Sequence, residues 1–379
     1  MSGVPNICDY VKRNLKTFDE CPLNRVDSLV FSWFAYFRFP EEAVGVVGDE
    51  GLAIKDLYRA DWFEAMIGPL YDPDDSLDLL LFAAASPRFR DIRVSNYVQD
   101  TNEIISRQFS GTAFRISDTE TYVGFRGTDN TMVGWKEDLN MSFADTVPSQ
   151  LSAVGYLEHV AARSQGRLWC GGHSKGGNLA VYASVMATDE VRNRVLCAFT
   201  HDGPGFPEKM MRDERWQSSR VYIDKTIPQS SVIGMLFENQ EIGYKIVHSD
   251  ATGFYQHDPF SWEVNGLDFV EVPELGGGAT RFDKSLNSYL ANSQPEEREH
   301  IVDAIFSVLE ASGEDTFAGV KANWKTAFPK MAIAASVLDA KERSIVLNAV
   351  GKIVGKMLPS KEQLSSLASY FKPSSLRDA

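Results

Sequence analysis

The alternation of apolar and polar positions divides the chain into a helical start, a strand-rich middle and a helical end. Residues 26–37 are almost all apolar, and Asp27 or Ser28 is placed to cap a helix there. Pro40 and two glutamates predict the start of another element. At Asp72 a capping acid precedes a proline, which predicts a helix beginning at residue 73. The first hundred residues are therefore expected to be mostly helical.

Strand patterns begin at about residue 108. Segments 108–116 and 121–125 alternate and are rich in β-branched and aromatic residues, with a turn signal between them. Further strands are expected from Leu168 and over 195–200, 219–223 and 244–247. Helical patterns separate the later strands and return near residue 295. Strands that alternate with helices predict an α/β fold with a mainly parallel sheet covered on both faces.

Residues 168–180 join a short apolar strand to an alanine-rich helix through a glycine-bounded turn. Gly172, Ser174 and Gly176 have the spacing of a nucleophile elbow. In such a turn the residues two before and two after the serine nearly touch, so both must be small. The helix dipole at this position favours developing negative charge. The pattern predicts Ser174 as a nucleophile, against the alternative of an ordinary joint with a buried serine.

A serine nucleophile needs a base, and in this fold the chain order is serine, acid, histidine. His201, His248 and His257 follow Ser174 within the strand region. His257 is in a loop after the last expected strand, which is where a general base must lie to reach the serine. We therefore favour His257 over the alternative of a loop histidine that packs on aromatic neighbours.

Two aspartates compete for the role of the acid. Asp202 directly follows the 195–200 strand in a turn with two glycines, and Asp224 ends the next expected strand. Asp224 occupies the more usual strand for the acid, whereas Asp202 has the more specialised turn. We favour Asp202 and keep Asp224 as the alternative.

An acyl-transfer site also needs hydrogen-bond donors for the oxyanion. One donor is the backbone N–H after the nucleophile, here that of Lys175. Thr128 follows an expected strand and offers both an N–H and a hydroxyl as the second donor.

Several of these segments resemble known proteins. Residues 125–128 and 135–139 resemble the oxyanion-loop region of class 3 lipases, and residues 172–177 resemble their nucleophile elbow. More closely, the motifs at 127–138, 172–180, 202–206 and 256–262 resemble a bacterial family of uncharacterised α/β-hydrolase-like proteins related to class 3 lipases. The resemblance implies an α/β-hydrolase fold and a serine esterase or lipase. It implies Ser174 as nucleophile and Thr128 as oxyanion donor, and it supports His257 and Asp202.

Lys175 departs from the lipases, which commonly have leucine after the serine. A cation at the site mouth would favour anionic acyl substrates, whereas a solvated lysine stem would only cover apolar surface. Class 3 lipases carry a lid after the oxyanion residue, and Met132 and Trp135 suit such a lid or anchor the loop to the core. Met210 and Met211 are a second candidate wall of the substrate pocket.

Charge bounds the choice of partners. The net charge of −14 argues against nucleic acid. From Val320 onward the chain has ten Lys and Arg residues and only four Asp and Glu residues, so the C-terminal segment is basic. Residues 346–357 place apolar side chains at helical spacing with lysines on another face. Such a helix either packs on its own domain or makes a peripheral membrane contact.

The remaining features concern compartment and organisation. The chain has four cysteines, no secretory pattern at its N-terminus and no long apolar run, which favours a cytoplasmic protein. We expect an N-terminal helical part of the hydrolase domain over 1–100, a catalytic α/β-hydrolase core over 101–290 and a C-terminal helical extension over 291–379.

The predicted function is cleavage of lipid or short acyl esters by Ser174, His257 and an aspartate, chemistry that needs no metal or cofactor. The alternatives are an amidase or thioesterase with the same triad and a non-catalytic binding protein on a hydrolase fold.

Overall fold

The chain of 379 residues forms two compact units in the computed structural model. The first unit comprises residues 1–128 and 145–288, and the second comprises 129–144 and 289–379. The structure describes residues 3–276 apart from 47, 103–104, 106, 129–136, 138–140, 142–143, 232 and 236–242, and residues 295–350 apart from 315–319, 321–322, 341, 345 and 348–349.

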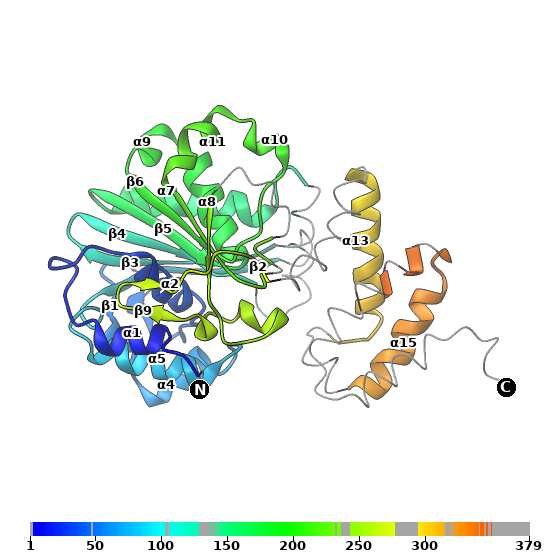
Figure 1. Ribbon diagram of the computed structural model, residues 1–379, viewed down its shortest axis with the longest axis horizontal. Coiled ribbons are helices and arrows are strands. Elements are labelled where there is room, and N and C mark those ends of the chain that lie inside the picture. The colour runs from blue at the N-terminus through cyan, green and yellow to red at the C-terminus, as the bar shows by residue number, and fades with distance from the viewer. Residues whose placement is uncertain are drawn as a thin grey trace. The chain divides into compact units, whose positions relative to one another are not determined.

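The first unit is built on an eight-stranded sheet whose strands lie in chain order (Figure 1). Strands β1 to β4 pair antiparallel, and β4 to β8 pair parallel. The strands are β1 (Leu52–Ala53), β2 (Arg93–Asn102), β3 (Arg107–Ser117), β4 (Glu120–Phe125), β5 (Arg167–His173), β6 (Val195–His201), β7 (Ile223–Pro228) and β8 (Tyr244–Val247). A separate two-stranded sheet pairs β9 (Val264–Asn265) with β10 (Asp268–Phe269).

Helices cover both faces of the large sheet, with α7 and α8 above it and α1, α4 and α5 below it in Figure 1. A methyl group on Gly111 of β3 would lie 2.6 Å from Tyr156 of α7, and one on Gly124 of β4 would lie 3.2 Å from Ala35 at the end of α2. These two glycines thus allow a helix to pack closely on each face of the sheet. The helices of this unit are α1 (Ile7–Arg13), α2 (Arg25–Phe34), α3 (Ile54–Leu57), α4 (Ala60–Met66), α5 (Pro73–Ala85), α7 (Pro148–Arg163), α8 (Lys175–Met186), α9 (Asp189–Arg192), α10 (Glu208–Met211) and α11 (Glu214–Ser219).

Short 3-10 turns complete the unit: η1 (Val44–Val46), η2 (Arg220–Tyr222), η3 (Gly253–His257) and η4 (Pro259–Ser261). A mostly parallel sheet flanked by helices, with a strand–turn–helix joint between β5 and α8, is an α/β-hydrolase fold. The predicted fold class is confirmed.

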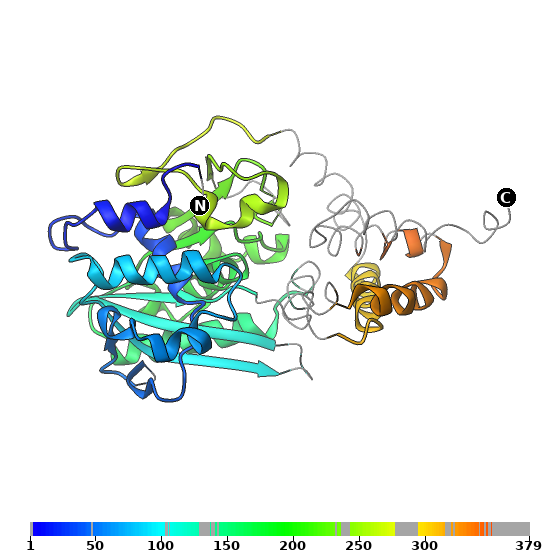
Figure 2. The same cartoon turned by 90° about the horizontal axis from the view of Figure 1, so that it is seen from below.

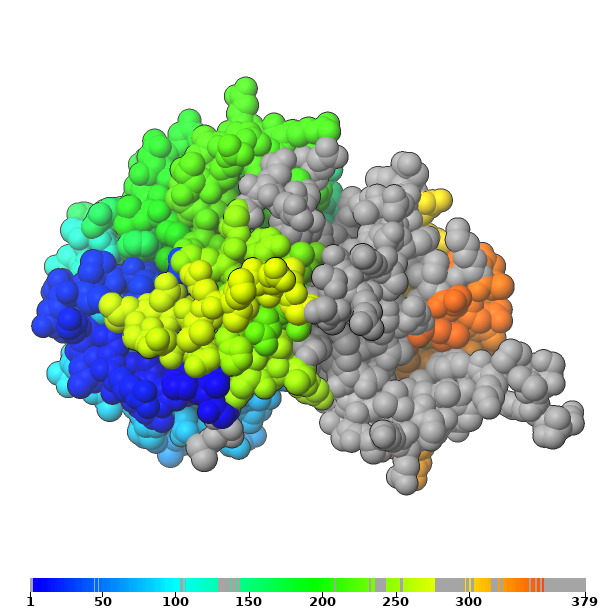
Figure 3. Space-filling view, viewed as in Figure 1, coloured from blue at the N-terminus to red at the C-terminus, as the bar shows by residue number. Residues whose placement is uncertain are grey.

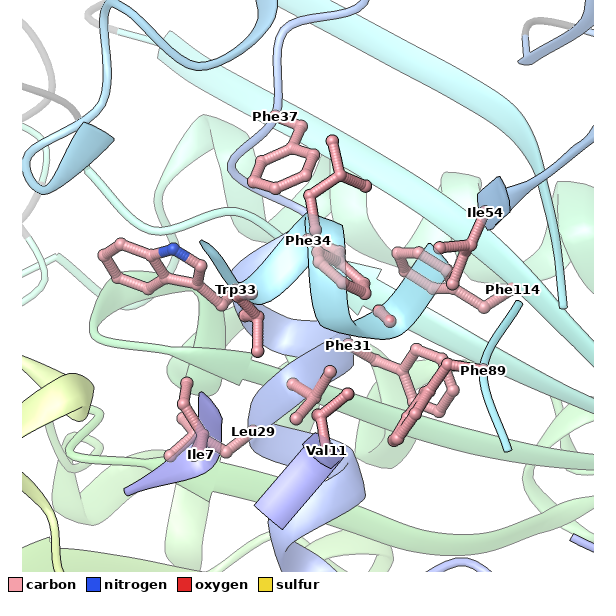
Figure 4. Close-up of a cluster of buried hydrophobic side chains, with 14 of the residues drawn as sticks. Ile7, Val11, Leu29, Phe31, Trp33, Phe34, Phe37, Ile54, Phe89 and Phe114 are labelled. Carbon is pink, nitrogen blue, oxygen red and sulfur yellow. The ribbon is translucent and has the colours of Figure 1, made fainter. Parts of the chain in front are cut away.

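An aromatic core lies under the sheet around α2 (Figure 4). Every residue of α2 from Val26 to Phe34 is buried, as expected for a helix surrounded by protein. The Phe31 ring lies 5.1 Å from that of Phe114 on β3 and 5.7 Å from that of Phe89. The N-terminal helices therefore build the same core as the sheet.

The N-terminal segment also contacts the chain after the sheet. Figure 3 shows the blue N-terminal region beside the yellow segment near residue 265, and Figure 2 shows the same two segments from below. Asn6 donates from Nδ2 to the Phe260 carbonyl at 2.9 Å, and the Val264 N–H donates to the Pro5 carbonyl at 2.8 Å. These bonds fix the segment that carries His257 against the start of the chain.

Several local predictions were wrong. Asn24, rather than Asp27 or Ser28, caps α2, and Asp27 closes the capping box from the third helical position. By contrast, the new element expected from residue 40 is present, as a turn at residues 41–42 followed by η1 (Val44–Val46). Of the strand expected over 219–223, residues 219–222 are the end of α11 and the η2 turn, and β7 begins only at Ile223. Strand β2 lies in a region expected to be helical, because pairing with β3 decides its conformation.

The second unit contains α13 (Pro295–Glu310) and α15 (Trp324–Ser336) around its own apolar cluster. Val346 and Val350 are buried in this cluster, and the basic positions 352 and 356 lie outside the described residues. Among the helices that the structure describes, none is long and apolar enough to span a membrane.

Candidate active site

The predicted elbow lies between β5 and α8. Ser174 has φ 58° and ψ −133°, a conformation that is strained for a residue with a side chain. Its N–H donates to the His201 carbonyl at the end of β6 at 2.9 Å, and its side chain is at the N-terminus of α8. The turn therefore places a serine hydroxyl where the helix dipole favours negative charge.

The glycines around Ser174 are required by close packing. A methyl group on Gly172 would lie 2.2 Å from the Gly176 carbonyl carbon. One on Gly176 would lie 2.1 Å from the Phe125 carbonyl oxygen at the end of β4. Both distances are far below van der Waals contact, so the predicted close approach of the two glycines is confirmed.

His257 and Asp202 form a direct contact beside the elbow. His257 ends η3, and its Nδ1 lies 2.6 Å from Oδ2 of Asp202. Because an ionised carboxylate only accepts, Nδ1 carries the proton and Nε2 carries the lone pair of the neutral ring. The Asp202 side chain is fully buried, whereas that of His257 is one-fifth exposed.

Asp202 is held by groups that the sequence did not reveal. Its backbone has φ 51°, and its N–H donates to the Thr226 carbonyl at 2.7 Å. The Ser231 hydroxyl and the Gly234 N–H, the latter at 3.0 Å, both donate to its Oδ1. The ammonium of Lys225 in turn donates to the Gly234 carbonyl at 2.8 Å. No motif signals Ser231 or Gly234, because their loop reaches Asp202 only through the pairing of β6 with β7.

Asp224 lies elsewhere. It is the second residue of β7 and pairs in register with Phe199, so it does not end a strand as expected. Its carboxylate accepts a bond from Arg25 Nη2 at 2.7 Å. The structure thus brings Asp202, and not Asp224, to His257, because the carboxyl ends of parallel strands meet at the sheet edge where the elbow lies.

The other two histidines considered have different partners. The His201 Nε2 lies 2.9 Å from the Ser28 hydroxyl, and burial lowers the pKa of its ring to about 3. His248 faces Glu263, with 2.6 Å between Nδ1 and Oε2. Among the described residues, no group of three or more histidine, cysteine or acidic side chains is arranged to hold a metal ion.

His173, the residue before Ser174, lies against His257. Their ring centroids are 4.4 Å apart, and His173 Nε2 is 2.8 Å from the His257 carbonyl oxygen. Burial first, and the neighbouring His257 second, hold the pKa of His173 well below its usual value. His173 is therefore neutral near pH 7.

The candidate oxyanion donors flank the elbow. Lys175 begins α8, and Thr128 is a half-buried residue after β4. A methyl group on the intervening Gly127 would lie 2.6 Å from the His173 carbonyl oxygen, so this loop runs directly against the elbow.

The Lys175 side chain is not at a site mouth, and it is not solvated. It is 1% exposed, and its ammonium donates to the Gln108 carbonyl on β3 at 2.9 Å. The side chain of a residue at the start of a helix points back past the N-terminus, here toward β3. The expected preference for anionic substrates therefore loses its basis.

The candidate pocket residues are partly described. Met210 and Met211 are 6% and 3% exposed, near the packed rings of Phe206 and Trp216. Met132 and Trp135 lie outside the described residues.

The chain can be compared with protein families and with solved structures. A family model described as Mbeg1-like matches residues 83–307. No curated protein matches the sequence. Among solved structures, the Rhizomucor miehei lipase in its propeptide complex aligns at 13% identity with a TM-score of 0.32, covering 43% of this chain and 58% of that one. The crystal structure of M37 lipase aligns at 12% identity with a TM-score of 0.34, covering 56% of this chain and 70% of that one. The alignment thus spans less than two thirds of the Rhizomucor lipase chain.

Proposed function

Because this chain belongs to the Mbeg1-like family and holds an elbow serine beside a His257–Asp202 pair, we propose that it is a serine hydrolase that cleaves carboxylic esters. The substrate class that we propose is a lipid or short acyl ester. Ser174, His257 and Asp202 are the proposed triad, with Asp224 outside it.

In the proposed reaction the Ser174 hydroxyl oxygen attacks the ester carbonyl carbon. His257 Nε2 takes the hydroxyl proton and then delivers it to the leaving alcohol, which leaves an acyl-enzyme. Water then attacks the carbonyl carbon of the acyl-enzyme. His257 Nε2 takes a proton from the water and returns it to the Ser174 oxygen as the acid is released. Asp202 keeps the proton of His257 on Nδ1 and stabilises the imidazolium that forms.

The tetrahedral oxyanion needs donors that are in place before the reaction. The Lys175 N–H at the start of α8 and Thr128 after β4 are the proposed pair. Loss of one such donor costs about 3–4 kcal/mol of transition-state stabilisation. The helix dipole of α8 adds to the same effect.

The observation that carries the proposal is the 2.6 Å contact between His257 and a fully buried Asp202. An ionised carboxylate is costly to bury, so it needs several hydrogen-bond partners. Asp202 has three donors, and one of them is the histidine beside the elbow. A carboxylate that only capped its own turn would not need that histidine.

The test is hydrolysis of p-nitrophenyl esters of increasing chain length by wild type and Ser174→Ala, with fluorophosphonate labelling in parallel. We expect labelling of wild type at Ser174, and loss of both labelling and hydrolysis in the variant. Ser184→Ala is the matched control, because Ser184 is a buried serine of α8, ten residues after Ser174, whose hydroxyl donates to the Ala180 carbonyl at 2.7 Å. Absence of labelling and hydrolysis in folded wild type would favour a non-catalytic binding protein.

A further inference from the structure

His173 is a buried residue that the proposed triad chemistry does not use. It is the last residue of β5, 3% exposed, and directly precedes the nucleophile. Its side chain reaches the backbone of η3, 84 residues later in the chain. This bond therefore joins the elbow to the turn that carries His257.

The hydrogen-bond partners settle the tautomer of His173. A backbone carbonyl only accepts, so the 2.8 Å contact with the His257 oxygen requires the proton on Nε2. Because burial keeps the ring neutral, Nδ1 then carries a lone pair. The Tyr36 hydroxyl lies 3.2 Å from Nδ1 and 3.2 Å from the His173 carbonyl oxygen, so it can donate to either.

The bond from His173 satisfies a carbonyl group at the end of the η3 turn. The last carbonyls of a helical turn have no partners within it. The His257 carbonyl accepts from His173 Nε2, and the preceding Gln256 carbonyl accepts from Trp262 Nε1 at 2.7 Å. Two side-chain N–H groups therefore hold the two final carbonyls of the turn that carries the base.

The ring of His173 also supports His257 directly. The two imidazoles lie 4.4 Å apart and are inclined by 34°, so the neutral ring packs against the face of the base. Trp33 and Trp262 meet His173 at interplanar angles of 65° and 66° and limit its own movement. His257 is thus held by Asp202 at Nδ1, by His173 at its carbonyl and by stacking on one face.

We propose that His173 is a positioning residue, which fixes the backbone and ring of His257 for proton transfer to and from Ser174. This inference rests on the proposed function. A base displaced by about 1 Å costs about 100-fold in rate, so the contact acts on kcat rather than on substrate binding.

The experiment compares three substitutions in the full-length chain. His173→Gln places an amide N–H near the position of Nε2 and keeps the donor. His173→Asn places its amide near Nδ1, so it cannot reach the His257 carbonyl. His173→Phe keeps a ring of similar size without a donor and also serves if the Asn variant fails to fold. Thermal unfolding of each variant establishes that it is folded.

We expect Gln to retain kcat within about 10-fold of wild type, while Asn and Phe lose about 100-fold with KM nearly unchanged. The proton NMR resonance of His257 Nδ1–H should persist in wild type and the Gln variant, and broaden in the other two. Equal kcat in all folded variants, or a Gln variant as slow as the Asn variant, would overturn the proposal.

Failure of the proposed function gives a different result. In that case wild type itself is neither labelled by fluorophosphonate nor active on esters. The NMR comparison then still tests whether His173 holds His257: a resonance that is equally sharp in all variants contradicts the positioning role, and selective broadening supports it.

Discussion

At the scale of single residues, the proposed chemistry depends on how a few polar groups are desolvated and paired. Asp202 is fully buried, but three donors compensate its charge. His173 is buried without a carboxylate partner and therefore stays neutral. The partners of each buried side chain thus decide how its burial is compensated.

The two aspartates considered from the sequence give a matched test. Asp202→Asn can present an amide to His257 and favour the wrong tautomer, so kcat should fall by about 10³- to 10⁴-fold. Asp224→Asn loses only a partly exposed contact with Arg25, and we expect kcat within about 3-fold of wild type. Ester hydrolysis by both variants at pH 7 is the measurement, and an equal loss in both would contradict the assignment of Asp202.

The residue scale also shows where sequence motifs are informative. The spacing of Gly172, Ser174 and Gly176 predicted the close turn, because local sterics dictate it. The partners of Asp202 have no such signature. Ser231 and Gly234 reach its carboxylate from a loop about thirty residues away, and the sequence contains no pattern for that contact.

At the scale of elements, the elbow is a joint at which β4, β5 and α8 approach more closely than side chains allow. The strain at Ser174 persists because these packed elements hold it. Helix α8 is buried along its first eleven residues, so it cannot move outward to relieve a clash. Substitution of a glycine at the joint must therefore displace backbone.

Two glycines on neighbouring helices test this argument. Gly176→Ala would place its methyl group 2.1 Å from a backbone oxygen, and we expect destabilisation by about 1–3 kcal/mol with loss of ester hydrolysis. Gly155→Ala in α7 meets nothing within 4 Å and is exposed, so we expect a gain of about 0.5–1 kcal/mol and normal activity. Urea unfolding measures both effects, and a Gly176→Ala protein as stable as wild type would refute the steric account.

Predictions of strands and helices from the sequence were correct where the segment itself carried the apolar and polar pattern and the turn or cap residues at its ends. Strands β3 and β4 were predicted within a residue of their ends, and the start of helix α5 was predicted at Pro73. Strand β2 and the start of β7 were missed, because their pairing with neighbouring strands decides their conformation rather than their own pattern.

At the scale of the whole molecule, a buried ion pair ties the N-terminal region to the core. Arg88 Nη2 lies 2.5 Å from Asp27 Oδ2, and both side chains are fully buried. Arg88 also donates to the Lys16 and Cys21 carbonyls at 2.8 and 3.0 Å. One guanidinium thus joins the loop before α2, α2 itself and the chain after α5.

Removal of this guanidinium should be costly. Arg88→Met leaves a buried carboxylate without its counter-ion, and we expect a loss of about 3–5 kcal/mol in the free energy of unfolding. Arg59→Met is the control, because Arg59 pairs with Asp61 on the exposed surface, where such a pair contributes about 0–1 kcal/mol. Denaturant unfolding of both variants is the measurement, and similar losses would show that the Arg88 network does not support the fold.

The sequence by itself determined a mainly parallel α/β fold, the elbow and the choice of His257 and Asp202 as candidates, because these depend on local spacing, turn sterics and chain order. The α/β-hydrolase fold was implied by its resemblance to relatives of class 3 lipases. Only the tertiary structure decided that Asp202 rather than Asp224 meets His257, that the Lys175 ammonium is buried against β3, and that His173 supports the base. Strand register and the packing of distant loops produce these contacts, and neither is encoded in any short stretch of the chain.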